Sequence, residues 1–361
     1  MPPNSLDHAV VIGIAQYPRL ARHNPPQPHH LQGPENDARA VRDWLVDPAG
    51  GNLPPRNVRL VCSADYPSGG TGRPIVDDLR QVLDDLRAVA DGAPAPLRRL
   101  YLYATGHGFG RKRNEGGVFM SDASPVDFTH LYVSSYLDWF VHAARFEEYV
   151  LLVDACMDQG RLVQPEVAHW RPVVAGAAHR GRVFTAYAAR FNGLAVEREM
   201  SSGQWHGVFT HALLLGLRGA AAVPGMGGRM EVTTHSLRDY LINTMRLHMS
   251  PAQRANPTVS DEPDFGETDR FVLVPDCAPA TPVRLPLPAH LAGRRLTLRD
   301  ARLAPVGTVV AAASDAATEV ALAAGFYSVE EPGGWRAAFE VVGGGMPVTL
   351  TPAPVLAPAG G

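Results

Sequence analysis

The chain has few cysteines, no strong excess of charge and no long hydrophobic run. Its 361 residues include only three cysteines, Cys62, Cys156 and Cys277, an odd and sparse set that does not make a disulfide framework. No two of them lie at the short spacing of a zinc knuckle. This cysteine usage favours a reducing cytoplasm, where each thiol has to be judged by its neighbours.

The other two absences exclude further classes of protein. Lys and Arg number 33 against 36 Asp and Glu, so the net charge of −3 gives no support to a nucleic-acid surface. No apolar stretch approaches the roughly 18 residues of a membrane-spanning helix. The N-terminal sequence MPPNSLDHAVVIGIAQ has no basic region before its short apolar run, so we expect neither a signal peptide nor a membrane anchor.

What is present is an alternation of strand and helix patterns. Hydrophobic residues make up 45% of the chain, which is enough for a sizeable core. The alternation predicts an α/β fold, a mostly parallel sheet sandwiched by helices. The expected strands are 8–15, 57–62, 100–104, 149–154, 183–188 and 271–274. The expected helices are 36–46, 76–90, 134–145, 208–217 and 236–249.

The composition changes near residue 276. Residues 277–289 are rich in proline and indicate a linker. Residues 290–361 contain short alternating apolar runs separated by Gly, Pro and Asp, which predict a small C-terminal all-β sandwich. We therefore expect a larger α/β domain over 1–276, a linker over 277–289 and a smaller accessory β domain over 290–361.

Two residues that can do chemistry follow neighbouring predicted strands. His107 stands in T-G-H-G after the strand 100–104, and Cys156 stands in D-A-C after the strand 149–154. Sites in parallel sheets form outside the carboxyl ends of the strands. A thiol becomes a nucleophile when a base or a positive charge lowers its pKa. A lone cysteine is more often a core residue, but this joint setting favours a His/Cys dyad.

Five segments resemble the caspase/metacaspase family, and its metacaspase-like bacterial members more than animal caspases. They are AVVIGI, LQGPENDA, YLYATGHG, LLVDAC and GVFTHALLLGL, and the match spans roughly Asp7 to Pro275. His107 precedes Cys156 by 49 residues, which matches the caspase spacing of roughly 50. The order, spacing and strand context together carry the resemblance.

The resemblance implies a role for six residues. His107 is the base and Cys156 the nucleophile, while the backbone N–H groups of Gly108 and Cys156 form the oxyanion hole. Asp37, Thr105 and Asp154 line the pocket for the residue N-terminal to the cut. Two carboxylates in one pocket favour a cationic side chain, so cleavage after Arg or Lys is predicted. The structural alternatives are a helix cap for Asp37 and a strand-end carboxylate for Asp154.

The sequence departs from the metacaspase pattern at two places. Met157-Asp158-Gln159-Gly160 stands where His-Ser-Gly usually follows the cysteine, and Pro34 stands where a cysteine is usual. Asp158 also adds negative charge near the thiol, which opposes thiolate formation unless it points away or meets a cation.

Activation and metal binding are open at this stage. The loop from Gly160 to Arg182 contains four arginines, so self-cleavage of a zymogen is a hypothesis. Asp122, Asp127 and Asp138 do not have the spacing of a calcium loop, and a solvated acidic face is favoured. His23, His29 and His30 share a Pro-rich loop without a thiol or carboxylate partner at ligand spacing. We therefore predict no cofactor or metal, and no recognisable site supports calcium activation.

The predicted function is a cysteine endopeptidase that cleaves proteins or peptides after Arg or Lys, with a role in bacterial defence or cell death by family analogy. The alternatives are another cysteine peptidase of the same broad fold, such as a clostripain- or separase-like enzyme, and a catalytically silent scaffold acting through its C-terminal domain. No G-x-G-x-x-G or G-K-[ST] follows the first strand and no G-x-S-x-G occurs, which disfavours a nucleotide-binding protein and a serine hydrolase. We expect a cytoplasmic monomer with a protein or peptide substrate, a protein partner at the C-terminal domain, and neither nucleic acid nor membrane.

Overall fold

The computed structural model describes most of the chain. The described residues are 2–20, 29–67, 72–158, 181–200, 203–225, 229–255, 259–277, 281–300, 303–312, 318–323, 325–332, 334–341 and 348–352. They fall into two compact units, Met1–Leu214 with Met245–Phe271, and Leu215–Thr244 with Val272–Gly361. No described helix is long and apolar enough to cross a membrane.

A six-stranded sheet forms the centre of the first unit. Five strands are parallel, and the sixth, β13, is antiparallel at one edge, in the order β13-β8-β7-β3-β1-β2. The bounds are Asp7–Gly13 for β1, Val58–Cys62 for β2, Leu97–Thr105 for β3, Phe146–Asp154 for β7, Arg182–Tyr187 for β8 and Asp264–Thr268 for β13. The inner strands are buried along almost their whole length, as expected for a parallel sheet covered on both faces.

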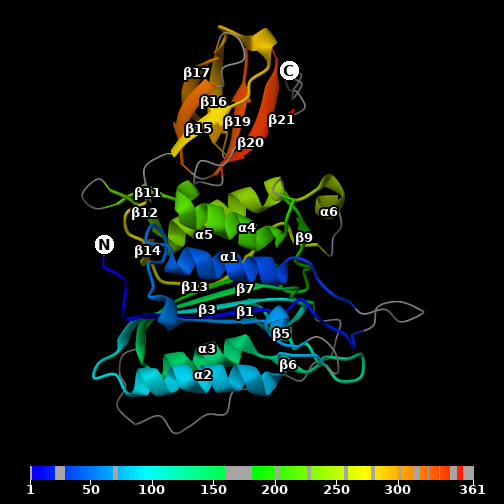
Figure 1. The fold of residues 1–361 in the computed structure, drawn as a ribbon, viewed down its shortest axis with the longest axis vertical. Coiled ribbons are helices and arrows are strands. Elements are labelled where there is room, and N and C mark those ends of the chain that lie inside the picture. The colour runs from blue at the N-terminus through cyan, green and yellow to red at the C-terminus, as the bar shows by residue number, and fades with distance from the viewer. Residues whose placement is uncertain are drawn as a thin grey trace. The chain divides into compact units, whose positions relative to one another are not determined.

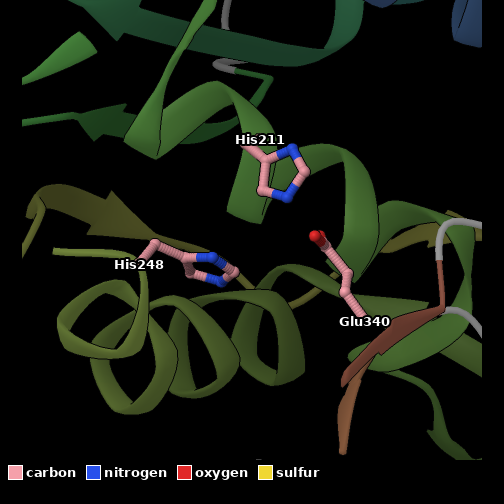
Figure 2. Close-up of side chains that lie close together, drawn as sticks. All are labelled: His211, His248 and Glu340. Carbon is pink, nitrogen blue, oxygen red and sulfur yellow. The ribbon is translucent and has the colours of Figure 1, made fainter. Parts of the chain in front are cut away.

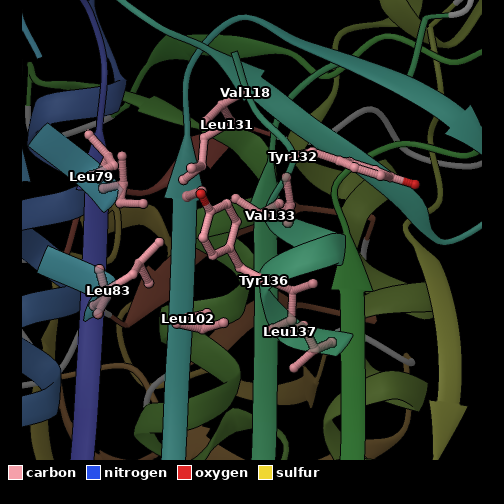
Figure 3. Packing of buried hydrophobic residues seen from close by; sticks show 14 of the residues in the cluster. Leu79, Leu83, Leu102, Val118, Leu131, Tyr132, Val133, Tyr136 and Leu137 are labelled. Atoms are coloured by element: carbon pink, nitrogen blue, oxygen red, sulfur yellow. The ribbon is translucent and has the colours of Figure 1, made fainter. Parts of the chain in front are cut away.

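Helices cover both faces of this sheet (Figure 1). One face carries α1 (Pro34–Val46) and α4 (Val208–Leu215), and the other carries α2 (Val76–Asp91) and α3 (Val133–Ala143). In α2 the buried residues Leu79, Leu83 and Leu86 recur at helical spacing, so one apolar stripe meets the core. Figure 3 shows Leu79 and Leu83 packed near Leu102 of β3 in this core.

Smaller elements of the first unit surround the carboxyl ends of the strands. A three-stranded antiparallel sheet follows His107, with β4 at Gly108–Lys112, β5 at Glu115–Phe119 and β6 at His130–Leu131. A hairpin precedes α4, with β9 at Glu197–Glu199 and β10 at Trp205–Gly207. The unit also contains α6 (Pro251–Ala255) and three short 3₁₀ helices, η1 (Pro55–Asn57), η2 (Ser63–Asp65) and η5 (Met245–His248).

The second unit is mostly antiparallel. Two strands, β15 (Thr281–Leu285) and β18 (Thr318–Leu322), form one sheet, and a five-stranded sheet has the order β17-β16-β19-β20-β21. Side chains of both sheets share one core that includes Leu285, Leu296 and Val329, so the predicted C-terminal sandwich is confirmed. The remaining bounds are Arg295–Asp300 for β16, Pro305–Val310 for β17, Gly325–Glu330 for β19, Arg336–Val341 for β20, Thr351–Pro352 for β21, Val223–Pro224 for β11, Met230–Thr233 for β12, Val272–Val274 for β14, Thr234–Thr244 for α5, Gly216–Ala220 for the π-helical turn η3 and Ala289–Leu291 for η6.

The predicted α/β fold class is confirmed, and three local predictions need correction. The sixth strand of the sheet is β13, whereas the predicted strand 271–274 becomes β14 and pairs with β12. The helix predicted over 208–217 is α-helical only to Leu215. Asp37 does not cap α1, because the N-cap is Gly33 without a side-chain bond. The predicted domain limits at 276 and 289 stay a prediction.

Candidate active site

The register of β3 and β7 brings His107 and Cys156 to one edge of the sheet. Thr105 lies directly opposite Asp154 in the parallel pair, and each residue of the dyad comes two positions later. Both side chains are half-buried, and both line one cavity of about 770 Å³. The cavity therefore lies outside the carboxyl ends of the parallel strands, where binding sites of such sheets form.

The imidazole of His107 is fixed by two aromatic neighbours. Its ring centroid lies 4.7 Å from that of Tyr17 and 4.1 Å from that of His29. The backbone N–H of His107 donates to the Tyr17 hydroxyl at 2.9 Å, and Nε2 lies 3.0 Å from the carbonyl oxygen of His29. A carbonyl oxygen can only accept, so this bond requires a hydrogen on Nε2. In the neutral ring, Nδ1 is then the basic nitrogen.

Cys156 differs from the other two cysteines in its access to the cavity. Its Sγ lies 3.9 Å from the carbonyl oxygen of Ala195, and the next residue, Met157, is anchored by a bond from its N–H to the carbonyl of Gly193 at 2.9 Å. Cys62 and Cys277 are buried, and burial raises their thiol pKa values to about 12 and about 11. Buried thiols of raised pKa are inert, so Cys156 is the best candidate for a reactive thiol.

Gly108 packs directly against the backbone of Cys156. A Cβ atom at this position would lie 2.6 Å from Cβ of Ala155 and 2.9 Å from the carbonyl oxygen of Cys156. Only glycine allows so close an approach. The two backbone segments predicted to supply the oxyanion hole are therefore adjacent.

The three predicted pocket residues also come together in this cavity. Thr105, Asp37 and Asp154 line it with exposed fractions of 2%, 1% and 5%. Asp154 Oδ2 accepts bonds from the Thr210 hydroxyl at 2.6 Å and the Thr210 N–H at 3.0 Å. Asp37 Oδ1 lies 2.7 Å from Nδ1 of His206, and its Oδ2 accepts the N–H of Gly207 at 2.8 Å.

Burial disfavours the ionised form of both carboxyl groups. It raises the pKa of Asp154 to about 7, and the nearby charge of Asp37 adds to this rise. Burial also raises the pKa of Asp37, although the bonds from His206 and Gly207 oppose the rise. A cation placed between the two carboxylates would favour their ionised forms.

Gly207 lets both carboxylates pack directly against its backbone. A Cβ on Gly207 would clash with Asp154 Oδ2 and would lie 3.1 Å from Asp37 Oδ2. Both carboxylates thus converge on a residue without a side chain. Any larger residue would displace the Asp154 carboxylate.

The cavity contains residues that the sequence motifs did not single out. Glu197 joins Asp37, Asp154 and Asp158 in its lining, and no Lys or Arg occurs among the lining residues that the structure describes. Glu197 lies in the hairpin between the recognised segments, where no periodicity or motif marks it. His206 and Thr210 flank or lie within the matched segment GVFTHALLLGL, but their contacts with Asp37 and Asp154 follow only from the fold.

A row of histidines leads away from Asp37. The ring centroid of His206 lies 6.4 Å from that of His211, which lies 5.3 Å from that of His248. Figure 2 shows His211 on α4 near His248 on η5. At the start of this row, Nδ1 of His206 lies 2.7 Å from the Asp37 carboxylate.

The other candidates for metal binding take structural positions. Asp122 accepts the Thr129 hydroxyl at 2.6 Å, and His30 Nδ1 lies 2.8 Å from the backbone N–H of Tyr17. His29 packs against His107. His23 and the loop residues 160–180, with Arg161, Arg171 and Arg180, lie outside the described residues, so the self-cleavage hypothesis stays a prediction.

Comparison with known proteins gives a family match and similarities to several proteins, of which three are described. The family model described as the caspase domain matches residues 6–262. A "Probable protease" of a Desulfuromonadales bacterium is 27% identical over 291 residues, 72% of this chain, and the match spans only 32% of that relative. Caspase-1 from Spodoptera frugiperda has a TM-score of 0.47 and 13% identity, covering 76% of this chain and 91% of its own. A protein from Geobacter sulfurreducens has a TM-score of 0.41 and 12% identity, covering 75% and 94%.

The family match covers more than half of the chain and includes both residues of the candidate dyad. It agrees with a parallel sheet whose neighbouring strand ends carry a histidine and a cysteine in a single cavity. The chain belongs to the caspase domain family of proteases.

Proposed function

We propose that the protein is a cysteine endopeptidase that cleaves after arginine or lysine. The observation that carries the proposal is a single cavity lined by His107, by Cys156 and by four carboxylates, without Lys or Arg among its described lining residues. The dyad supplies the chemistry and the carboxylates supply the preference for a cation.

The proposed reaction follows from the atoms at the strand ends. His107 Nδ1 takes the proton of the Cys156 thiol, and the thiolate attacks the carbonyl carbon of the peptide bond. The N–H groups of Gly108 and Cys156 stabilise the oxyanion. The imidazolium then gives its proton to the leaving amine, and a thioester to Cys156 remains. Water, deprotonated by His107, attacks the thioester, and the acid product leaves as the thiol is restored.

The preference for a basic residue follows from charge. Asp37 and Asp154 are buried side by side at the cavity, and each one raises the cost of ionising its neighbour. A guanidinium or ammonium group would relieve this repulsion and replace the water that the carboxylates lose. A substrate aspartate would add a further negative charge and is expected to be rejected.

Turnover of short fluorogenic peptides tests the proposal. Peptides ending in Arg, Lys, Asp or Leu are incubated with the wild type and with Cys156→Ala, with and without calcium. We expect cleavage after Arg and Lys that falls by about 10³-fold or more in the variant, because the nucleophile is lost. Cys277→Ala, which removes a buried thiol instead, is the matched control and should retain activity. Cleavage only after Asp or Leu would contradict the role of Asp37 and Asp154.

The biological setting is a proposal of a different kind. A role in bacterial defence or cell death, activation by self-cleavage, and a protein partner at the C-terminal sandwich rest on the family resemblance alone. The chain spans about a third of the curated relative it matches, so that relative's full activity is not carried over.

A further inference from the structure

Glu197 stands on the wall of the cavity that carries the two buried carboxylates. It is the first residue of β9, and it pairs across the hairpin with Gly207 of β10. Gly207 is the residue on which Asp37 and Asp154 converge. Glu197 and Gly207 both line the cavity, so three carboxylates and this glycine belong to one lining.

The start of α1 holds the Glu197 side chain in place. Its Oε2 accepts the backbone N–H groups of Gln32 at 3.1 Å and Gly33 at 2.8 Å, immediately before the helix begins at Pro34. Backbone N–H groups at a helix N-terminus carry partial positive charge and attract acidic side chains. Burial is the main cause of the raised pKa values of Asp37 and Asp154. The negative charge of Glu197 adds a smaller contribution to each of them. Its field therefore reaches the predicted pocket.

The carboxylate oxygens that could accept hydrogen bonds from a ligand belong to Asp154 and Glu197. Both oxygens of Asp37 already take part in bonds, to His206 and Gly207. On Asp154 both Thr210 bonds fall on Oδ2, so Oδ1 carries no bond from a described residue. On Glu197, Oε1 has only a long contact of 3.3 Å with the Gln32 N–H. A planar guanidinium presents five N–H donors over a wide fork, whereas an ammonium is a compact point charge with three donors.

We propose that Glu197 is a specificity-determining residue whose carboxylate pairs with the side chain of a substrate arginine and selects arginine over lysine. The inference rests on the proposed function, because it needs a basic side chain in this cavity. It adds a third carboxylate to the pair implied by the family resemblance, and it divides the work between them. Asp154 and Glu197 pair with the guanidinium. Asp37, whose oxygens are already bonded to His206 and Gly207, adds negative charge without a direct bond.

Two probes without a peptide bond test binding directly. Agmatine and cadaverine, the decarboxylated forms of arginine and lysine, are titrated calorimetrically into the Cys156→Ala protein, which binds without turnover. We expect agmatine to bind about tenfold more tightly, because one additional charge-assisted hydrogen bond is made. Adding Glu197→Gln should bring the ratio close to one. Glu199→Gln removes the same charge from an exposed position on the same strand and should leave the ratio unchanged.

Turnover gives a second readout in the protein with an intact dyad. In Glu197→Gln we expect kcat/KM for an Arg peptide to fall about tenfold relative to a Lys peptide, through KM and not through kcat. Gln keeps an oxygen for the amides of Gln32 and Gly33, and an unchanged thermal midpoint confirms the fold. If Glu197→Gln does not fold, Glu197→Asp keeps the charge on a shorter side chain and should lose part of the selectivity.

The outcomes separate the two proposals. Equal Arg-to-Lys selectivity in the wild type, Glu197→Gln and Glu199→Gln, with cleavage after Arg intact, would overturn the role of Glu197 and leave the proposed function standing. A wild type that cleaves only after Asp or Leu, and binds neither amine, would overturn both. Selectivity lost in Glu197→Gln and kept in Glu199→Gln supports the inference.

Discussion

Asp154 shows how individual residues of this site balance burial against charge. Its carboxyl group is 5% exposed and lies beside a second buried carboxyl group, which raises the energy of the ionised form. The two bonds from Thr210 offset part of this cost, and the Thr210 hydroxyl is itself held 2.6 Å from the Tyr103 hydroxyl. In the proposed function, a cationic ligand would therefore favour the ionised form of this carboxylate.

The raised pKa of Asp154 predicts pH-dependent binding of a basic ligand. Because this pKa lies near 7 and above its usual value of 3.8, the group is neutral at pH 6 and charged at pH 8. Affinity for agmatine in the Cys156→Ala protein should therefore fall by about tenfold from pH 8 to pH 6. Calorimetric titration across this range is the measurement.

Asp154→Asn supplies the control for this prediction. It should bind agmatine weakly at both pH values, because the titrating group is gone while His206 and Asp37 remain. An equally large pH dependence in Asp154→Asn would contradict the assignment of the titration to Asp154.

The same scale shows which site residues a sequence can reveal. His107 and Cys156 stand in short motifs directly after recognisable strands, and Asp154 ends such a strand, so their meeting could be predicted. Glu197 and His206 come from a hairpin without a strong pattern, and they reach the cavity only because β9 pairs with β10 beside α1. The expectation that Asp37 caps a helix was wrong because its side chain bonds to that hairpin.

At the scale of elements, the register of two strands sets the geometry of the site. A shift by one residue in the pairing of β3 with β7 would move the Thr105–Asp154 pair out of line and reverse the faces of the side chains. The buried length of these strands resists such a shift. The strands rich in β-branched and aromatic residues could be predicted from the sequence. The edge strand β13, with the sequence DFGET, is too polar and too exposed to show a strand pattern.

The packing of α2 predicts a stability change without a loss of chemistry. Leu79 is completely buried against the sheet, so Leu79→Ala should lower the free energy of unfolding by about 2–5 kcal/mol. Urea denaturation measures the change. Val89, on the same helix and 46% exposed, gives the control variant Val89→Ala, which should change stability by less than about 0.5 kcal/mol. Equal effects of the two substitutions would contradict the packing of this helix.

At the scale of the whole molecule, the chain combines a caspase domain with a β-sandwich. The first unit contains every residue of the proposed site, and the second has its own core around Leu285, Leu296 and Val329. A sequence reveals such a division through its change in composition. It does not reveal that residues 215–244 cluster with the later β strands, because that grouping depends on contacts between distant segments.

A preference for arginine predicts self-processing of the intact protein. The arginines between residues 160 and 182 follow the catalytic cysteine and suit the proposed specificity. The purified wild type should therefore contain fragments cut after one of them, and Cys156→Ala should stay intact. Intact-mass spectrometry distinguishes these outcomes. Identical masses, apart from the substitution, would exclude self-processing under the conditions used.

The central claim is that the Cys156 thiol is a nucleophile beside a pocket for a basic side chain. Labelling by a peptidyl-arginine chloromethyl ketone tests it most directly, since alkylation needs both the reactive sulfur and a bound arginine. We predict one adduct per chain, located on Cys156 by peptide mapping, and none with the matching aspartate reagent. Labelling of Cys62 or Cys277 instead, or equal labelling by both reagents, would contradict the account.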